Sequence, residues 1–401
     1  MTQPLWVPSE QRRRRSNLTK FLGQVNERYH HRLESYTQLW EWSVERIPEF
    51  WAAMWEFARI RASRPYDRIV DDLTRFPGAR WFPGARLNFA ENLLGHGESA
   101  RPALIFRDET GRSSVMTYAE LRDAVAHLAA ALRAEGVQPG DRVAAYMPNL
   151  IETAAAMLAA TSVGAVWASC ATDIAPAAAV ERLGQIGPAV LFTADGYSYK
   201  GRSFDARANA KRVAEGISTL KRVVVIAHAG RDRNGGERPA LDGIPHAIGY
   251  DDFLMRGRAE AIRYEQLSAD HPVFIMFSSG TTGRPKCLVQ GAAGVLINHL
   301  KELLLHTDLT PDDRITYLTT CSWMMWNWLL SALAVGATVV LYDGNPNHPD
   351  PGAMWRLVQD ERISIFGCSA SYLNFLRGRA IRVTRWPTLA RPNGSSDGGL
   401  R

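Results

Sequence analysis

The sequence is poor in cysteine and has no paired cysteine motif. Four cysteines occur in 401 residues, and they are widely separated (Cys170, Cys287, Cys321 and Cys368). A disulfide-stapled scaffold and a zinc ribbon both need closely spaced cysteines, so the spacing argues against both classes. We expect a cytoplasmic protein whose cysteines stay reduced, and we predict no metal site.

A secretory signal and a membrane span are also missing from the pattern. Residues 1–10 are polar and have no apolar core segment, so we expect no leader. Residues 315–342 contain no charged side chain, but polar residues are scattered through this run. A membrane helix needs about 20 mainly apolar residues. We therefore predict a strand, a buried helix and a second strand at residues 338–342.

Basic charge is not spread along the chain either. The net charge is +6, but residues 377–401 alone carry six arginines against one aspartate. Residues 1–376 are nearly neutral, with 41 basic and 40 acidic side chains. A nucleic-acid-binding protein carries its basic residues on a folded face, so we expect no nucleic-acid partner. The cluster Arg12 to Arg15 is interpreted as a solvated helix face.

The remaining composition is typical of a folded protein. Hydrophobic residues make up 46% of the chain and charged residues 22%, which argues against disorder. We expect a helical extension at residues 1–92, a main domain at 93–376 and a divergent tail at 377–401. Aromatic residues at helical spacing in the extension are expected to pack on the main domain. They are Trp40, Phe50, Trp51, Trp55 and Phe57.

The main domain shows alternating strand and helix patterns. A capping box at Thr117 and Glu120 begins one helix, and glycine and proline separate the other segments. Short apolar runs typical of buried strands occur at residues 103–107, 142–147, 165–169, 191–194 and 223–227. This alternation predicts an α/β fold with largely parallel strands flanked by helices.

A loop rich in glycine and hydroxyl residues follows another apolar run. Residues 273–277 predict a strand, and residues 278–286 have the sequence SSGTTGRPK. Glycine permits left-handed backbone conformations, so consecutive amides can form an anion-binding nest, and Lys286 adds a mobile cation for phosphates. A solvent-exposed hairpin or linker has the same composition. The residues alone leave both interpretations open.

A Walker-type phosphate loop is the main alternative for this segment. It requires two glycines with four residues between them, then lysine and a hydroxyl residue. Counting from Gly280, Pro285 stands at the second glycine position and Cys287 at the magnesium-binding hydroxyl position. The pattern therefore disfavours a GTPase or a P-loop kinase.

The string FSSGTTGRPK at residues 277–286 resembles the phosphate-binding signature of the adenylate-forming superfamily, which includes acyl-CoA synthetases, adenylation domains and luciferases. Within it, the chain is similar to acetoacetyl-CoA synthetases from about residue 5 to residue 376. The N-terminal extension is similar to that of acetyl-CoA synthetases. The segments that carry the likeness are residues 81–94, 184–186, 195–197, 289–301, 323–327, 342–344 and 366–370.

The resemblance implies a ligase reaction in two steps. A carboxylate attacks the α-phosphate of ATP with the help of Mg²⁺, which gives an acyl-adenylate and pyrophosphate, and the thiol of coenzyme A then displaces AMP. Acetoacetate, a short keto acid, is the implied substrate. Lys286, Thr281 and Thr282 are the implied catalytic residues. The implied ATP-phosphate ligands are Ser278, Ser279, Gly280, Thr281, Thr282, Gly283 and Lys286.

Two further sites follow from the resemblance. The first is an acyl pocket, in which bulky side chains leave room only for a short acid. Ordinary packing in the hydrophobic core is an alternative role for these side chains. This acyl pocket is formed by Trp323, Met324, Met325, Trp326 and Asn327. The second resembles the place where acetyl-CoA synthetases hold the nucleotide end of coenzyme A, and a solvated turn explains it almost as well. It consists of Lys200, Gly201 and Arg202.

The chain departs from the family pattern at several positions. Ser322 replaces a glycine, and Gln290 and Ala292 replace two histidines. The family's adenine loop, ribose-binding aspartate and C-terminal catalytic lysine do not follow Leu376. A frameshift explains residues 377–401 better than a natural linker, although the pattern leaves both interpretations open. We therefore expect no turnover from these 401 residues alone. Another short-chain acyl-CoA synthetase and a non-catalytic nucleotide-binding fragment remain open, and the pattern does not predict an oligomeric state.

Overall fold

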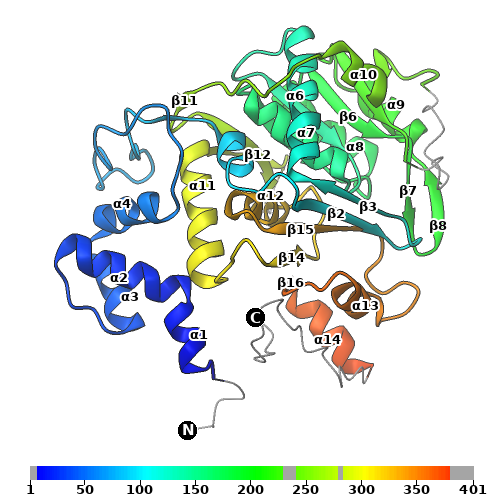
Figure 1. Cartoon of the computed structure of the whole chain (residues 1–401). Coiled ribbons are helices and arrows are strands. Elements are labelled where there is room, and N and C mark those ends of the chain that lie inside the picture. Colours follow the sequence, from blue (N-terminus) through cyan, green and yellow to red (C-terminus); the bar gives the residue numbers. More distant parts are fainter. Residues whose placement is uncertain (1–6, 229–240, 279–282, 380–401) are drawn as a thin grey trace.

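The computed structural model describes residues 7–228, 241–278 and 283–379, and two sheets form its centre (Figure 1). The larger sheet has seven strands, and all neighbouring strands in it are parallel except the last pair. Its order is β10 (Ala247–Gly249), β9 (Arg222–Ile226), β6 (Val190–Ala194), β4 (Arg142–Tyr146), β5 (Val166–Cys170), β12 (Pro272–Ser278) and β13 (Lys286–Gly291).

The second sheet has five strands, which are parallel except at the edge formed by its last pair. Its order is β16 (Ile365–Gly367), β14 (Arg314–Tyr317), β15 (Thr338–Asp343), β2 (Pro102–Asp108) and β3 (Ser113–Thr117). Two small antiparallel pairs complete the described strands. They are β1 (Arg86–Leu87) with β11 (Leu267–Ser268), and β7 (Gly196–Tyr199) with β8 (Arg202–Asp205).

Helices cover both faces of the larger sheet, as the sequence predicts. Because side chains alternate along a strand, Val143 and Ala145 of β4 join one apolar cluster while Ala144 and Tyr146 join another. The first cluster includes α6 (Tyr118–Ala134) and α7 (Ile151–Ser162), and the second includes α8 (Pro176–Ile186) and α9 (Arg207–Glu215). The α/β fold with parallel strands flanked by helices is therefore confirmed.

The remaining helices fill the space between and around the sheets. The predicted capping box is present at the start of α6, where Thr117 and Glu120 satisfy each other's backbone N–H groups. The other helices of the main domain are α5 (Phe89–Leu94), α10 (Tyr250–Arg256), α11 (Ala292–Lys301), α12 (Met324–Leu330), α13 (Ala353–Asp360) and α14 (Ala370–Gly378). A π-helical turn (Glu302–His306) follows α11, and a 3₁₀ turn (Ser331–Val335) follows α12.

The uncharged run at residues 315–342 has the predicted form of a strand, a buried helix and a second strand. It comprises the end of β14, α12 with its 3₁₀ extension, and the beginning and middle of β15. Within the described ranges, no helix has the length and apolar character needed to cross a membrane.

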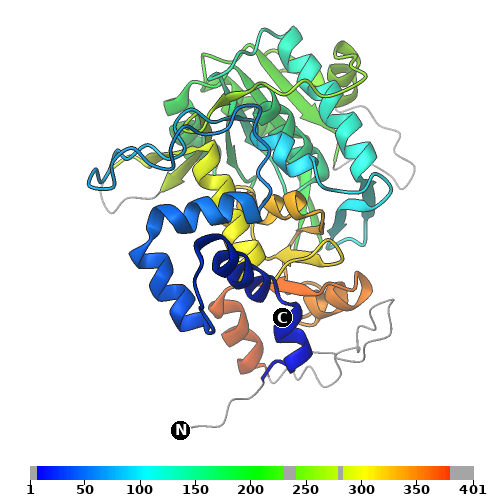
Figure 2. The same ribbon diagram turned by 60° about the vertical axis from the view of Figure 1, so that its left-hand side comes forward.

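The N-terminal extension is mainly helical up to Phe57 and packs on the main domain (Figure 2). It contains α1 (Glu10–Arg15), α2 (Asn17–Tyr29), α3 (Tyr36–Glu45) and α4 (Ile47–Phe57). Phe21 contacts Phe57 edge-on with a centroid distance of 5.2 Å, and Trp55 lies 4.5 Å from Phe82. Trp40 does not share this packing, because its side chain is 52% exposed. Helical spacing places it on the solvent side of α3.

Candidate functional site

The carboxyl ends of β4, β5 and β12 meet at one edge of the larger sheet. The chain leaves β4 for α7 on one face and leaves β5 for α8 on the other face. Ligands of open α/β sheets bind in the crevice outside the strand ends at such a reversal of direction. The region after Tyr146, Cys170 and Ser278 is therefore the candidate site.

The predicted phosphate loop connects β12 to β13. Ser278 is the last residue of β12 and pairs with Lys286, the first residue of β13. Lys286 is exposed, and Gly283 has a φ of +90°, where its missing side chain leaves open space. Ser279, Gly280, Thr281 and Thr282 lie outside the described residues. The loop thus leaves a strand, as predicted, and its two ends also form the hairpin that the alternative interpretation required.

A segment before α12 crosses the ends of β4 and β5. Ser169 donates its hydroxyl hydrogen to the carbonyl of Cys321 at 2.6 Å, and Cys321 Sγ lies 3.1 Å from the carbonyl oxygen of Met147. The backbone N–H of Ala171 donates to the hydroxyl oxygen of Ser322. Serine at position 322 therefore gives the β5 end an acceptor that glycine would lack.

The five residues predicted to line an acyl pocket divide into two groups. Trp326 is fully buried and Asn327 is nearly so, whereas Trp323 is 68% exposed and Met324 is 44% exposed. Met325 is partly buried. Trp326 therefore belongs to the hydrophobic core, and the first residues of the segment present apolar side chains to solvent beside it.

Asn327 connects this segment to the strand that leads into the phosphate loop. Its Nδ2 lies 3.1 Å from Sδ of Met276, which is two residues before Ser278 on β12. Its Oδ1 is buried and has no hydrogen-bond partner among the described residues. Because a buried polar atom normally has a partner, this oxygen is a candidate for contact with a ligand or a water molecule.

A cavity of about 750 Å³ is lined in part by residues of α11 and by Met324. Gln290 and His299 are among its lining residues, and Oε1 of Gln290 is buried with no hydrogen-bond partner in the described part of the chain. His299 faces Oγ of Ser331 at 2.9 Å, and burial lowers the pKa of its imidazole to about 4. The imidazole is therefore neutral near pH 7. The cavity thus borders the predicted acyl segment.

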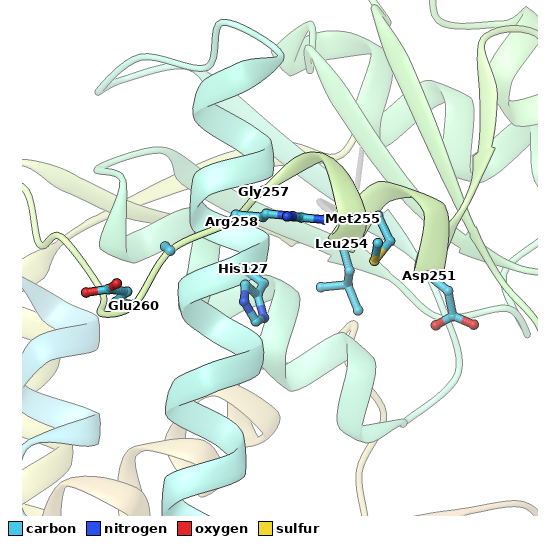
Figure 3. Close-up of a pocket in the computed structure, with 8 residues that line it drawn as sticks. His127, Asp251, Leu254, Met255, Gly257, Arg258 and Glu260 are labelled. Carbon is cyan, nitrogen blue, oxygen red and sulfur yellow. The ribbon is translucent and has the colours of Figure 1, made fainter.

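A second cavity of similar volume lies over α6, where the chain leaves α10 (Figure 3). His127 and Leu254 point into the same space, with Arg258 above them. Gly257 allows the close approach of the two segments, since a Cβ there would lie 2.1 Å from the carbonyl oxygen of His127. None of the predicted site residues that the structure describes lines this cavity.

Lys200 and Gly201 form the tip of the β7–β8 hairpin. Both have positive φ, 55° and 73°, as a two-residue hairpin turn with left-handed conformation at both positions requires. Lys200 Nζ lies 5.5 Å from the centre of the Tyr199 ring, and Arg202 lies over Phe204. The described residues thus show an exposed turn that carries two cations.

The structure adds Asn149, which the sequence indicated only as part of a helix start. Its Oδ1 accepts a hydrogen bond from Nε1 of Trp326 at 2.8 Å, and its backbone N–H donates to Oδ1 of Asp343 at 2.9 Å. Its Nδ2 donates to the carbonyl of Tyr342 at 3.1 Å. Asn149 therefore joins the end of β4, the end of β15 and α12. Its position directly after a predicted strand was the available signal.

Comparison with known proteins places most of this architecture in one family. Residues 94–393 match the AMP-binding enzyme family, and residues 36–93 match the acetyl-coenzyme A synthetase N-terminus family. The chain belongs to the AMP-binding enzyme family. The residues that match the AMP-binding enzyme family include both described ends of the phosphate loop, the α12 segment and the β7–β8 hairpin.

Similar proteins include acetoacetyl-CoA synthetases from distant organisms. The protein from Danio rerio is 42% identical over 381 residues, which cover 94% of this chain and 56% of that protein. The protein from Rhizobium meliloti is 42% identical over 378 residues, with the same two coverages. The solved acetoacetyl-CoA synthetase from Streptomyces lividans superposes with a TM-score of 0.86 at 40% identity, covering 95% of this chain and 57% of that one. The chain thus spans a little over half the length of these relatives.

Proposed function

We propose that this chain forms the ATP- and acid-binding part of an acetoacetate–CoA ligase. The reaction would join acetoacetate and coenzyme A through an acyl-adenylate, with release of pyrophosphate and AMP. The proposal rests on how two parts of the chain meet. The phosphate hairpin, formed by β12 and β13, and the α12 segment, residues 323–327, both lie at the ends of β4, β5 and β12. Asn327 of the α12 segment contacts Met276 of β12. The similarity to acetoacetyl-CoA synthetases supports the choice of acid.

The phosphate hairpin would anchor ATP in the first step. Ser278 and Lys286 face each other at its base, so hydroxyl and ammonium groups can converge on the same phosphates. Charge that develops on the departing pyrophosphate is stabilised best by such preorganised donors. In this proposal Thr281 and Thr282 add hydroxyl donors beyond that base.

Mg²⁺ would add positive charge between the phosphates. Within the part of the chain that the structure describes, no group of three histidine, cysteine, aspartate or glutamate residues could hold a metal ion. In this proposal the magnesium ion arrives on ATP and takes its ligands mainly from phosphate oxygens.

The α12 segment would bind the acid. Trp323 and Met324 present apolar surface next to the cavity along α11, whereas Trp326 supports them from the core. A short acid would be selected because bulky side chains occupy the space that a longer chain needs. Each added methylene is worth only about 1–3 kcal/mol, so the discrimination would be graded.

Coenzyme A would be held by its nucleotide end at the β7–β8 tip. Lys200 and Arg202 form no ion pair within the described ranges, so their charges are available to a phosphate. The four described cysteines are all free thiols, which supports our placement of the reaction in the cytoplasm.

Pyrophosphate exchange tests the proposal directly. The chain, joined to the C-terminal part of an acetoacetyl-CoA synthetase relative, is incubated with ATP, Mg²⁺, labelled pyrophosphate and acetoacetate, and ATP binding by the 401 residues alone is measured separately by calorimetry. Exchange that depends on acetoacetate would support the ligase assignment. ATP binding with no exchange for any acid would instead indicate a nucleotide-binding fragment, and absence of ATP binding would contradict the proposal.

A different short acid is the second candidate. A malonamoyl-CoA synthetase from Penicillium aethiopicum is 39% identical over 380 residues, which cover 90% of this chain and 52% of that protein. This identity is close to that of the acetoacetyl-CoA synthetases, so it favours a test with several acids. Comparison of exchange rates with acetoacetate, malonamate, acetate and propionate would decide between them.

A further inference from the structure

The tip of the β7–β8 hairpin is held from outside the hairpin. Oε1 of Glu109, in the turn between β2 and β3, accepts the backbone N–H of Gly201 at 2.7 Å. Gly201 has little room, since a Cβ there would lie 2.8 Å from Cε1 of His348. The tip is therefore held by a carboxylate, and the ring of His348 lies against Gly201.

Glu109 also holds the loop that follows β15. Its Oε2 accepts the backbone N–H of Asn345 at 2.7 Å, and Nδ2 of Asn345 donates to Oη of Tyr199 at 2.9 Å. Tyr199 directly precedes the tip. One carboxylate thus joins the β2–β3 turn, the hairpin tip and the loop after β15.

The charge of Glu109 is matched by backbone donors rather than by a cation. In the described ranges Glu109 takes part in no ion pair, and its two known partners are N–H groups. A negative side chain beside Lys200 and Arg202 would by itself repel an anion. Its presence there is explained better by the geometry it imposes on the turn than by its charge.

We propose that Glu109 is a positioning residue for phosphate binding at the hairpin tip. It fixes the left-handed turn at Lys200 and Gly201 before the ligand arrives, so that Lys200 and Arg202 meet the phosphate without first being ordered. The ligand class is a nucleoside carrying a 3′-phosphate, which is the nucleotide end of coenzyme A. This inference rests on the proposed function of the tip.

Calorimetry with adenosine 3′,5′-bisphosphate tests the role of Glu109. Glu109→Gln should weaken binding about three- to tenfold, the cost of ordering a flexible side chain on binding. Gly201→Ala should weaken it as well, although it leaves all three charged side chains in place. Binding of ATP should not change in either variant, and Glu45→Gln, an exposed glutamate of α3, serves as the matched control.

A cycle of variants separates this inference from the proposed function. Lys200→Ala with Arg202→Ala should lower affinity for the bisphosphate about tenfold or more, and adding Glu109→Gln should then cause little further loss. If removal of the two cations changes nothing, the proposed function of the tip is wrong. If it weakens binding but Glu109→Gln leaves affinity unchanged or increases it, the positioning role is overturned. Affinities are compared at a temperature where all variants are shown to be folded.

Discussion

Lys286 begins β13 opposite Ser278, and its side chain is exposed. Lys286→Ala should weaken ATP binding by about 1–3 kcal/mol, the scale of one charge-assisted hydrogen bond. The fold should be unaffected because the side chain contributes no core packing. Calorimetry with ATP and Mg²⁺ measures the change, and Lys221→Ala is a control at another exposed lysine. Equal affinity of the two variants would show that Lys286 is an ordinary surface residue.

Asp343 lies at the end of β15, where it accepts the backbone N–H of Asn149. Loss of water around the carboxyl raises its pKa to about 6, and the nearby carboxylates of Asp108 and Glu109 add to this effect. Its folded-state pKa therefore lies above its unfolded value. The stability that it contributes is fully present below pH 3.8 and is lost as the pH rises through 6.

Asp343→Asn removes this titration. The quantity compared is the unfolding free energy of the variant minus that of the parent chain. This difference should increase by about 1 kcal/mol from pH 5 to pH 8, because only the parent carries a partly buried negative charge at pH 8. Urea unfolding at the two pH values measures the difference. Asp360→Asn, at an exposed position, should show no such gain. A difference of opposite sign would refute the assignment.

At the scale of elements, α12 joins a core residue to a surface residue within one turn. Trp326 is completely buried and hydrogen-bonded to Asn149, whereas Trp323 is largely exposed. Trp326→Ala should cost about 3–5 kcal/mol of unfolding free energy, and Trp323→Ala should stay within about 0.5 kcal/mol. Chemical denaturation of both variants checks this contrast. Similar losses would mean that α12 does not divide in this way.

Much of this arrangement could be predicted from local pattern. The strand runs and the capping box of α6 were predictable because burial and capping depend on residues close in sequence. The exposure of Trp323 and Trp40 could not be predicted, because helical spacing alone does not show which face of a helix packs against the core. The hydrogen bonds of Asn149 and Glu109 join segments far apart in the sequence. No local pattern contains them.

At the scale of the whole molecule, the chain spans a little over half the length of the acetoacetyl-CoA synthetases that it matches. The 401 residues contain no Tyr-Gly-x-Thr-Glu-like segment and no Thr-Gly-Asp sequence. A phosphate anchor alone does not close a site or exclude water from an adenylate. With ATP, Mg²⁺, coenzyme A and acetoacetate, the purified chain should release no AMP above background. Steady AMP release in a coupled assay would overturn this expectation.

The contact of Asn149 with Trp326 and Asp343 also limits which substitutions related chains can accept at these positions. An amide at position 149 presents one acceptor to an indole and one backbone donor to a carboxylate at the same time. Without the indole, the amide oxygen would be buried with no hydrogen-bond donor, so a change at position 326 should be accompanied by a change at position 149. Position 343 has more freedom, because its partner is a backbone group that every residue except proline provides. We therefore expect covariation between 149 and 326 across related chains, and weaker coupling of either to 343.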